Sequence, residues 1–159
     1  MIKVREDAGG KGINVSKMIH TIGGETIATG IIGGTTGRFI EEQLDHYRVP
    51  HLFVKTSDKT RTNMKMIDLY HQTYTDINEP GMTPSEDALS ELESKIFSIA
   101  KPGDMLILSG SIPAGATRKL YASWIEKANE FGLTTILDTD GEGLALGIEA
   151  KPTIIKPNI

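Results

Sequence analysis

Residues 104–137 read DMLILSGSIPAGATRKLYASWIEKANEFGLTTIL and have the pattern of one strand–helix–strand unit. Two short, continuously apolar runs, at residues 104–108 and 133–137, are typical of strands buried on both faces of a parallel sheet. The segment between them carries apolar side chains at helical spacing and stops near Gly132. This helical face consists of Leu120, Tyr121, Trp124, Ile125 and Ala128. Two strands joined by a helix predict a right-handed crossover and a parallel sheet.

The same alternation continues on both sides of this unit. Upstream, Thr83-Pro84-Ser85-Glu86 has the form of a capping box with Thr83 as the N-cap, and a helix is expected from there to about residue 99. Downstream, a small helix around residues 144–148 precedes a last strand at 153–156. From residue 83 onward we therefore expect an α/β fold with a mostly parallel, doubly wound sheet.

The N-terminal half adds two helices and several strands. A Gly-rich start introduces a helix from Gly12 to about residue 22, and a second helix is expected from about Gly37. The expected strands lie at residues 25–32, 51–55, 60–69 and 72–77, and a short strand-like stretch opens the chain at residues 1–5.

One of these strands carries polar side chains at alternate positions. A period of two places Arg61, Asn63 and Lys65 on the same face of the strand at residues 60–69. Such a face is either simply exposed to water or part of a binding site, and the strand alone leaves both interpretations open.

Composition excludes several classes of protein. The 159 residues contain 17 Lys and Arg against 21 Asp and Glu, a net charge of −4, so a nucleic-acid partner is not expected. No cysteine is present, which excludes disulfides and thiol chemistry. The apolar runs are far shorter than the roughly 20 residues of a spanning helix, and no pair of histidines has metal-ligand spacing. We expect a cytoplasmic protein with no membrane partner and no protein-bound metal site.

A glycine-rich segment directly precedes the first helix. In Ala8-Gly9-Gly10-Lys11-Gly12-Ile13-Asn14, unpaired backbone N–H groups and the positive end of the helix dipole could receive an anion, with Lys11 adding a cation and Asn14 a hydrogen-bond donor. The segment fits neither the Walker pattern nor the dinucleotide fingerprint, which disfavours a dinucleotide-binding oxidoreductase. A flexible strand-to-helix turn remains the alternative.

Polar residues also follow three of the expected strands. Ser109-Gly110-Ser111-Ile112-Pro113, Asp138-Thr139-Asp140-Gly141 and Lys156-Pro157-Asn158 occupy carboxyl ends of parallel strands, where open α/β sheets bind ligands. Because Ile107 stands where a nucleophile elbow needs its first glycine, a serine hydrolase is excluded. Lys11 and Arg61 could converge as a point charge and a bidentate fork for a phosphate.

Taken together, these segments resemble the ribokinase-like sugar kinases, in the phosphofructokinase B branch. The resemblance rests on five motifs in the family's order. They are Gly9-Gly10-Lys11-Gly12-Ile13-Asn14-Val15-Ser16 with Gly23 and Gly33 at the family's spacing, Thr60-Arg61-Thr62-Asn63, Leu108-Ser109-Gly110-Ser111-Ile112-Pro113, Leu137-Asp138 and Ile155-Lys156-Pro157-Asn158. It implies a three-layer sandwich with a mostly parallel, doubly wound sheet and a small β lid, whose strands would lie within about residues 1–8 and 51–77.

The resemblance also implies a function, namely ATP-dependent phosphorylation of a ketohexose phosphate. The form with lysine is similar to members acting on fructose 1-phosphate, which becomes the 1,6-bisphosphate, or on tagatose 6-phosphate. By resemblance, Lys11 and Arg61 would hold the substrate phosphate, and Mg²⁺ would bridge the ATP phosphates. The other implied substrate-binding residues are Gly9, Gly10, Gly12, Asn14, Asn63 and Ser109, and the implied nucleotide-binding residues are Lys156 and Asn158.

The resemblance covers only the N-terminal part of a family member. The chain is roughly half the typical length, and it lacks the first strand of the family and the second half that carries the nucleotide site and the Gly-Ala-Gly-Asp motif with the catalytic base. We therefore expect no catalytic residue here and the base beyond Ile159. Two outcomes stay open: half of a kinase that forms homodimers through its lid sheet, or a non-catalytic sugar-phosphate-binding or dimerising module.

Overall fold

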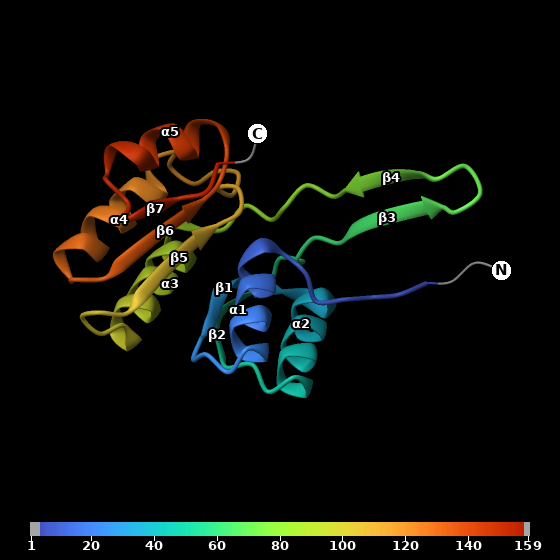
Figure 1. The fold of residues 1–159 in the computed structure, drawn as a ribbon, viewed down its shortest axis with the longest axis horizontal. Helices are drawn as coiled ribbons and strands as arrows, with labels where there is room; N and C mark the ends of the chain where they lie inside the picture. Colours follow the sequence, from blue (N-terminus) through green and yellow to red (C-terminus); the bar gives the residue numbers. More distant parts are fainter. Residues whose placement is uncertain (1–3, 158–159) are drawn as a thin grey trace.

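The computed structural model describes residues 4–157. Helices and strands alternate along most of the chain, with one hairpin inserted between them (Figure 1). In chain order the elements are α1 (Lys11–Thr21), β1 (Ala28–Gly33), α2 (Gly34–His46), β2 (His51–Thr56), β3 (Asn63–Asp68), β4 (Thr73–Asn78), α3 (Glu86–Ile99), β5 (Met105–Ser109), α4 (Leu120–Glu130), β6 (Thr134–Asp138), α5 (Gly141–Glu149) and β7 (Ile154–Ile155).

The strands joined by helices pair in parallel, as the sequence predicts. β1 pairs with β2 from Ala28 opposite His51 to Gly33 opposite Thr56. β5 pairs with β6, and β6 with β7, so the second sheet has the order β5-β6-β7. The parallel strands thus form two sheets, and within each sheet their carboxyl ends lie at one edge.

Helices cover both faces of the first sheet and connect it to the second. α2 packs on β1 and β2, and a cluster that includes Ile32, Ile40, Leu44 and Phe53 fills this side. α3 also packs on β1 and β2, while α1 contacts both β1 and β5. Beside the second sheet, α4 and α5 pack on β6 and on each other. The result is the layered arrangement that an α/β protein needs in order to bury its strands.

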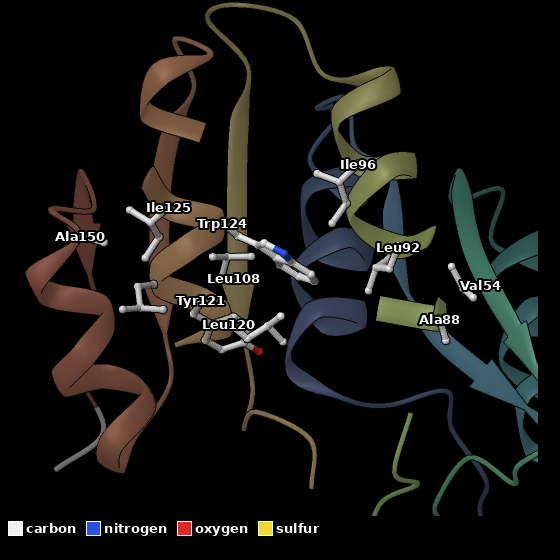
Figure 2. Close-up of a cluster of buried hydrophobic side chains, with 11 residues drawn as sticks. Val54, Ala88, Leu92, Ile96, Leu108, Leu120, Tyr121, Trp124, Ile125 and Ala150 are labelled. Carbon is white, nitrogen blue, oxygen red and sulfur yellow. The ribbon is translucent and has the colours of Figure 1, made fainter. Parts of the chain in front are cut away.

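The larger core cluster joins the two sheets through α3. Figure 2 shows Trp124 on α4 between Leu108 on β5 and the side chains of α3. The Trp124 indole also donates a hydrogen bond to Glu93 Oε2 on α3, at 3.0 Å. Leu137 and Ile125 are fully buried in this cluster. The side chains predicted to form the inner face of the helix at residues 120–128 are all buried, which confirms that prediction.

Several element boundaries differ from the sequence-based expectation. The N-cap of α3 is Ser85 rather than Thr83, because the Ser85 hydroxyl accepts the hydrogen bond from the Ala88 N–H. The second helix begins at Gly34, earlier than expected. Arg61 lies before β3 rather than in it, so only Asn63 and Lys65 alternate along that strand. Residues 4 and 5 are not in a strand, and residues 1–3 lie outside the described part.

The β3–β4 hairpin differs from the rest of the fold. It is antiparallel, with Asn63 opposite Asn78 and Asp68 opposite Thr73. Every residue of both strands is exposed, and Figure 1 shows the hairpin extending away from the layered body. β2, by contrast, lies within the range expected to contain lid strands but belongs to a parallel pair of the body. No helix within residues 4–157 is long and apolar enough to cross a membrane.

Candidate anion-binding site at the strand ends

The glycine-rich segment brings backbone N–H groups to the start of α1. Gly10 is the N-cap with φ 109°, a left-handed conformation that favours glycine, and it offers no side chain to cap the helix. The Asn14 N–H bonds to the Gly10 carbonyl at 2.9 Å, which closes the first turn. Ala8, 2% exposed, packs into the core beside β1 and anchors the segment. The start of α1 therefore has free donors and a positive dipole end, which suit an anion.

The carboxyl ends of β5 and β6 lie against this helix start. Ser109 and Asp138, the last residues of their strands, are register partners, and the Gly110 N–H donates to the Asp138 carbonyl at 2.9 Å. Gly12 sits so close to β5 that an added Cβ would lie 3.3 Å from the Ser109 hydroxyl oxygen. Two segments that the sequence singled out independently therefore meet at one place.

A carboxylate with two ammonium groups occupies the same edge. Lys11 Nζ lies 3.0 Å from Asp138 Oδ1, and Lys156 Nζ lies 3.3 Å from the same oxygen. The Asp138 side chain is 13% exposed, whereas those of Lys11 and Lys156 are 37% and 63% exposed. The cluster carries a net charge of +1 and presents its cations outward, which suits a phosphate-bearing ligand.

The ionisation of Asp138 follows from this arrangement. Burial by itself raises the pKa of the carboxyl, but the hydrogen bonds and charges of Lys11 and Lys156 outweigh burial and lower the pKa below its ordinary value of 3.8. Asp138 is consequently ionised throughout the neutral range, and both ion pairs persist there.

Arg61 and Asn63 lie outside this cluster. Arg61 belongs to the segment that runs from the body to the hairpin, and this segment is fixed at one end by Thr60, whose N–H donates to the Gly33 carbonyl at 3.0 Å. Asn63 is the first residue of β3. Both side chains are exposed, and within residues 4–157 no hydrogen bond or ion pair joins either of them to Lys11 or Ser109.

The structure thus gathers part of the predicted site. Lys11, Gly12, Ser109 and Lys156 meet at the strand ends, with Gly9, Gly10 and Asn14 in the adjoining loop and first turn. Asn158 lies outside the described residues. What the sequence did not indicate is the role of Asp138 as the common partner of two lysines. Its place at the end of a buried strand was the available signal.

Two hollows in the described part of the molecule bear on the position of the strand-end cluster. One of about 500 Å³ lies between the two parallel sheets and is bounded by α1, α3 and β5, with Gly12 at its border. The other, of about 440 Å³, is at the exposed tip of the hairpin around Leu69 and Gln72. Apart from Gly12, the residues of the strand-end cluster line neither of these two hollows. Within residues 4–157 no group of three metal-ligating side chains occurs.

An α/β fold with glycine-rich backbone and lysines at the strand ends defines a class of phosphate-ligand-binding proteins. Comparison with known protein families identifies the class more closely. The family described as "pfkB family carbohydrate kinase" matches residues 1–159. The chain belongs to the pfkB family of carbohydrate kinases. This confirms the resemblance on which the sequence-based prediction was founded.

Curated and solved relatives agree with this assignment. A tagatose-6-phosphate kinase from Staphylococcus epidermidis is 38% identical over 154 residues, 96% of this chain and 49% of the relative. Phosphofructokinase-2 from Escherichia coli, in complex with substrates and products, has a TM-score of 0.89 and 31% identity, covering 94% of this chain and 49% of that chain.

A third relative has a different description. A possible 1-phosphofructokinase from Thermotoga maritima has a TM-score of 0.85 and 26% identity, covering 99% of this chain and 52% of that chain. These likenesses confirm the expected ribokinase-like α/β fold. The chain spans about half the length of the relatives it matches.

Proposed function

We propose that this chain is the sugar-phosphate-binding part of an ATP-dependent ketohexose phosphate kinase, with fructose 1-phosphate as substrate and fructose 1,6-bisphosphate as product. The observation that carries the proposal is the Lys11 ammonium, held at the strand ends beside the glycine-rich start of α1. A fixed cation next to unpaired backbone N–H groups favours a phosphate over a neutral sugar.

The proposed roles divide between two ligands. Lys11 would bind the substrate phosphate, Ser109 would line the same pocket, and Arg61 would reach it when the segment before the hairpin closes over the sugar. The proposed contacts to sugar hydroxyls come from Gly9, Gly10, Gly12, Asn14 and Asn63. Lys156 and Asn158 would lie on the nucleotide side. Phosphoryl transfer needs positioning and charge neutralisation above all, and these residues supply both.

The residues at the strand ends fit ATP better than they fit a protein-bound metal ion. The exposed Lys156 ammonium contacts the same Asp138 carboxylate as Lys11. It would give ATP a positive charge next to the site proposed for the sugar phosphate. Mg²⁺ would be held through the ATP phosphates, where it neutralises negative charge. No base is assigned within residues 1–159, and the proposal expects that group in the rest of the kinase.

Calorimetric titration of this chain with fructose 1-phosphate tests the substrate half of the proposal. We expect binding that Lys11→Ala weakens about 10-fold or more, because a hydrogen bond to a charged group contributes about 1.5–3 kcal/mol. Lys17→Ala is the matched control, because Lys17 is also on α1 but bonds to the Ala8 carbonyl instead of Asp138. Heat that is absent in the wild type, or unchanged in Lys11→Ala, would contradict the proposal.

An assay of ADP release with Mg-ATP and fructose 1-phosphate tests the catalytic half. We expect no turnover by this chain alone, since no base is assigned in it. Turnover that disappears in Lys11→Ala would place a base within these residues and overturn that part of the proposal.

Tagatose 6-phosphate is the alternative substrate, and a specific observation favours it: the curated relative reported above is a tagatose-6-phosphate kinase. Both sugars present a phosphate to the same lysine, so the phosphate contact does not distinguish them. Titration with each sugar phosphate in turn does, and tighter binding of tagatose 6-phosphate would reassign the substrate.

The hairpin supports a further part of the proposal, a homodimer formed through the lid sheet. Met64, Met66 and Ile77 are exposed and share one face of the hairpin by alternation and register. A non-catalytic binding or dimerising module would use the same surfaces, and absence of turnover in the complete parent protein would favour that alternative.

A further inference from the structure

Lys11 stands where helix electrostatics alone would disfavour it. It is the first residue of α1, beside the positive end of the helix dipole, and its N-cap Gly10 supplies no side-chain oxygen. Anions are stabilising at a helix start and cations are not. Asp138 offsets this unfavourable interaction with a carboxylate oxygen 3.0 Å from Lys11 Nζ.

Asp138 is the fixed member of the pair. It ends β6, the central strand of the β5-β6-β7 sheet, and is 127 positions from Lys11 in the sequence. Its side chain is 13% exposed, whereas that of Lys11, with four rotatable bonds, is 37% exposed. A short buried side chain on a paired strand has far less freedom than a long one at a helix start. The carboxylate therefore determines where the ammonium lies.

We propose that Asp138 is a positioning residue, which holds the Lys11 ammonium in place at the strand ends for the phosphate of an incoming ligand. The ligand class rests on the proposed function, whereas the positioning rests on the geometry alone. The same oxygen also contacts Lys156, so Asp138 holds the cations of the sugar-phosphate side and the nucleotide side near each other.

Positioning and net charge predict opposite effects of Asp138→Asn on anion binding, so the substitution distinguishes them. Asp138→Asn removes a negative charge and so should strengthen the binding of any anion through long-range attraction. If Asp138 positions Lys11, the same substitution releases a flexible lysine that the ligand must then order. That ordering weakens binding by about 2- to 10-fold.

The binding experiment is calorimetry of the full chain with inorganic phosphate and with fructose 1-phosphate as probes. Asp140→Asn is the matched control, since Asp140 is an exposed carboxylate two residues away whose side chain makes no capping hydrogen bond. Both substitutions raise the net charge by one unit. We expect Asp138→Asn to weaken binding of both probes and Asp140→Asn to leave it unchanged or slightly stronger. Equal strengthening by both would overturn the proposal.

A spectroscopic experiment reads the positioning without any ligand. In ¹H–¹⁵N spectra of lysine ammonium groups, an ion-paired ammonium is protected from exchange with water, and the Lys11 signal is identified by its loss in Lys11→Arg. We expect the signal in the wild type and in Asp140→Asn, and its loss in Asp138→Asn. A Lys11 signal that is absent in the wild type, or that persists in Asp138→Asn, would overturn the proposal.

Two further results separate the possible failures. If the wild type binds neither probe but the Lys11 signal depends on Asp138, the proposed function fails and the positioning stands. If Asp138→Asn does not fold, Asp138→Glu replaces it, because it keeps the charge and moves the carboxylate by one methylene. We expect Asp138→Glu to weaken phosphate binding as well, and unchanged binding there would count against positioning.

Discussion

The layered body and the β3–β4 hairpin differ in how far their strands are buried. In β1 and β6 each residue is buried or half-buried, whereas every residue of β3 and β4 is exposed. A two-stranded hairpin without a packed face is at best marginally stable in water. Apolar side chains in the body therefore stabilise the fold, while those on the hairpin are available to a ligand or to another chain.

The two faces of the hairpin carry different side chains. On one face Lys65 pairs with Asp76 across the strands at 3.4 Å, and the Lys65 ammonium lies 4.7 Å from the ring centre of Tyr74. The other face carries Met64, Met66 and Ile77 without such polar pairs. The two faces therefore differ in their cross-strand polar contacts, although exposed Ile67 and Tyr74 also lie on the face of Lys65.

A core leucine and a hairpin methionine should differ strongly in their contribution to the free energy of unfolding. Leu137 is fully buried on β6, so Leu137→Ala removes packing and leaves a cavity. We expect a loss of about 2–5 kcal/mol in the free energy of unfolding, measured by urea denaturation. Met66→Ala, at a residue 51% exposed, should change it by less than about 0.5 kcal/mol. Similar losses for the two variants would contradict the division into body and hairpin.

A second comparison concerns two glycines. Gly33 ends β1, and an added Cβ there would lie only 2.2 Å from the Asp58 carbonyl oxygen and 2.4 Å from that of Thr56. Because these neighbours are backbone atoms, we expect Gly33→Ala to destabilise the chain by about 1–3 kcal/mol in the same assay.

The matched control for Gly33 is Gly81, which follows the hairpin. An added Cβ at Gly81 would meet only the Arg61 Cδ atom, at an ordinary 3.9 Å. Gly81→Ala should therefore lie within about 0.5 kcal/mol of the wild type. Equal effects at the two positions would show that the backbone near Gly33 can shift to accept a Cβ atom without loss of stability.

The contrast between body and hairpin also explains what the sequence could predict. The helices and strands of the body are predictable because burial requires apolar residues at regular spacing, as in the helix that buries Trp124 and Ile125. The sequence does not decide the N-cap of α3, because Thr83 and Ser85 both suit an N-cap and only the hydrogen bond from the Ala88 N–H distinguishes them. The alternation of polar residues extends to Arg61, before the start of strand pairing at Asn63, so the pattern predicts a longer strand than the structure has.

The candidate site follows the same logic. Strand-end segments were predictable because parallel strands place their carboxyl ends on one edge of a sheet. The contact between Lys11 and Asp138 was not, because the residues are 127 positions apart and only tertiary packing brings them together. No local pattern marks which carboxylate a distant lysine will meet.

Asp138 in the body and Asp68 in the hairpin should differ in how they make stability depend on pH. The lysine contacts of Asp138 lower its pKa below 3.8 in the folded chain, so the folded state binds fewer protons than the unfolded state. Its stabilising contribution is complete above that value and is lost as the pH falls through the folded pKa. We expect the stability difference between wild type and Asp138→Asn to shrink as the pH falls below 3.8 in urea denaturation.

Asp68 is the exposed counterpart. The His71 side chain, 2.6 Å away, and the backbone N–H groups of His71 and Tyr70 lower its pKa as well. Because the whole group is open to solvent at the hairpin turn, Asp68→Asn should leave the acid limb of the stability curve nearly unchanged. A larger acid response for Asp68 than for Asp138 would show that the hairpin contributes to the stability of the body.

A charge placed on the apolar face of the hairpin should change the stability of the chain little but its association clearly. Met66→Lys introduces a charge on the apolar face of the hairpin, where the side chain is 51% exposed, so the free energy of unfolding should change by less than about 0.5 kcal/mol. If that face meets a second copy, the substitution buries an unpaired charge in the interface and weakens the dimer. Sedimentation velocity over a range of concentrations measures this directly.

The neighbouring residue provides the control, because successive residues of a strand point to opposite faces. Ile67 is 64% exposed and shares the face of Lys65, so Ile67→Lys adds the same charge to the other side of the hairpin. We expect Ile67→Lys to associate like the wild type and Met66→Lys to sediment as a monomer. Equal losses of association in the two variants would mean that net charge, rather than one face of the hairpin, governs assembly.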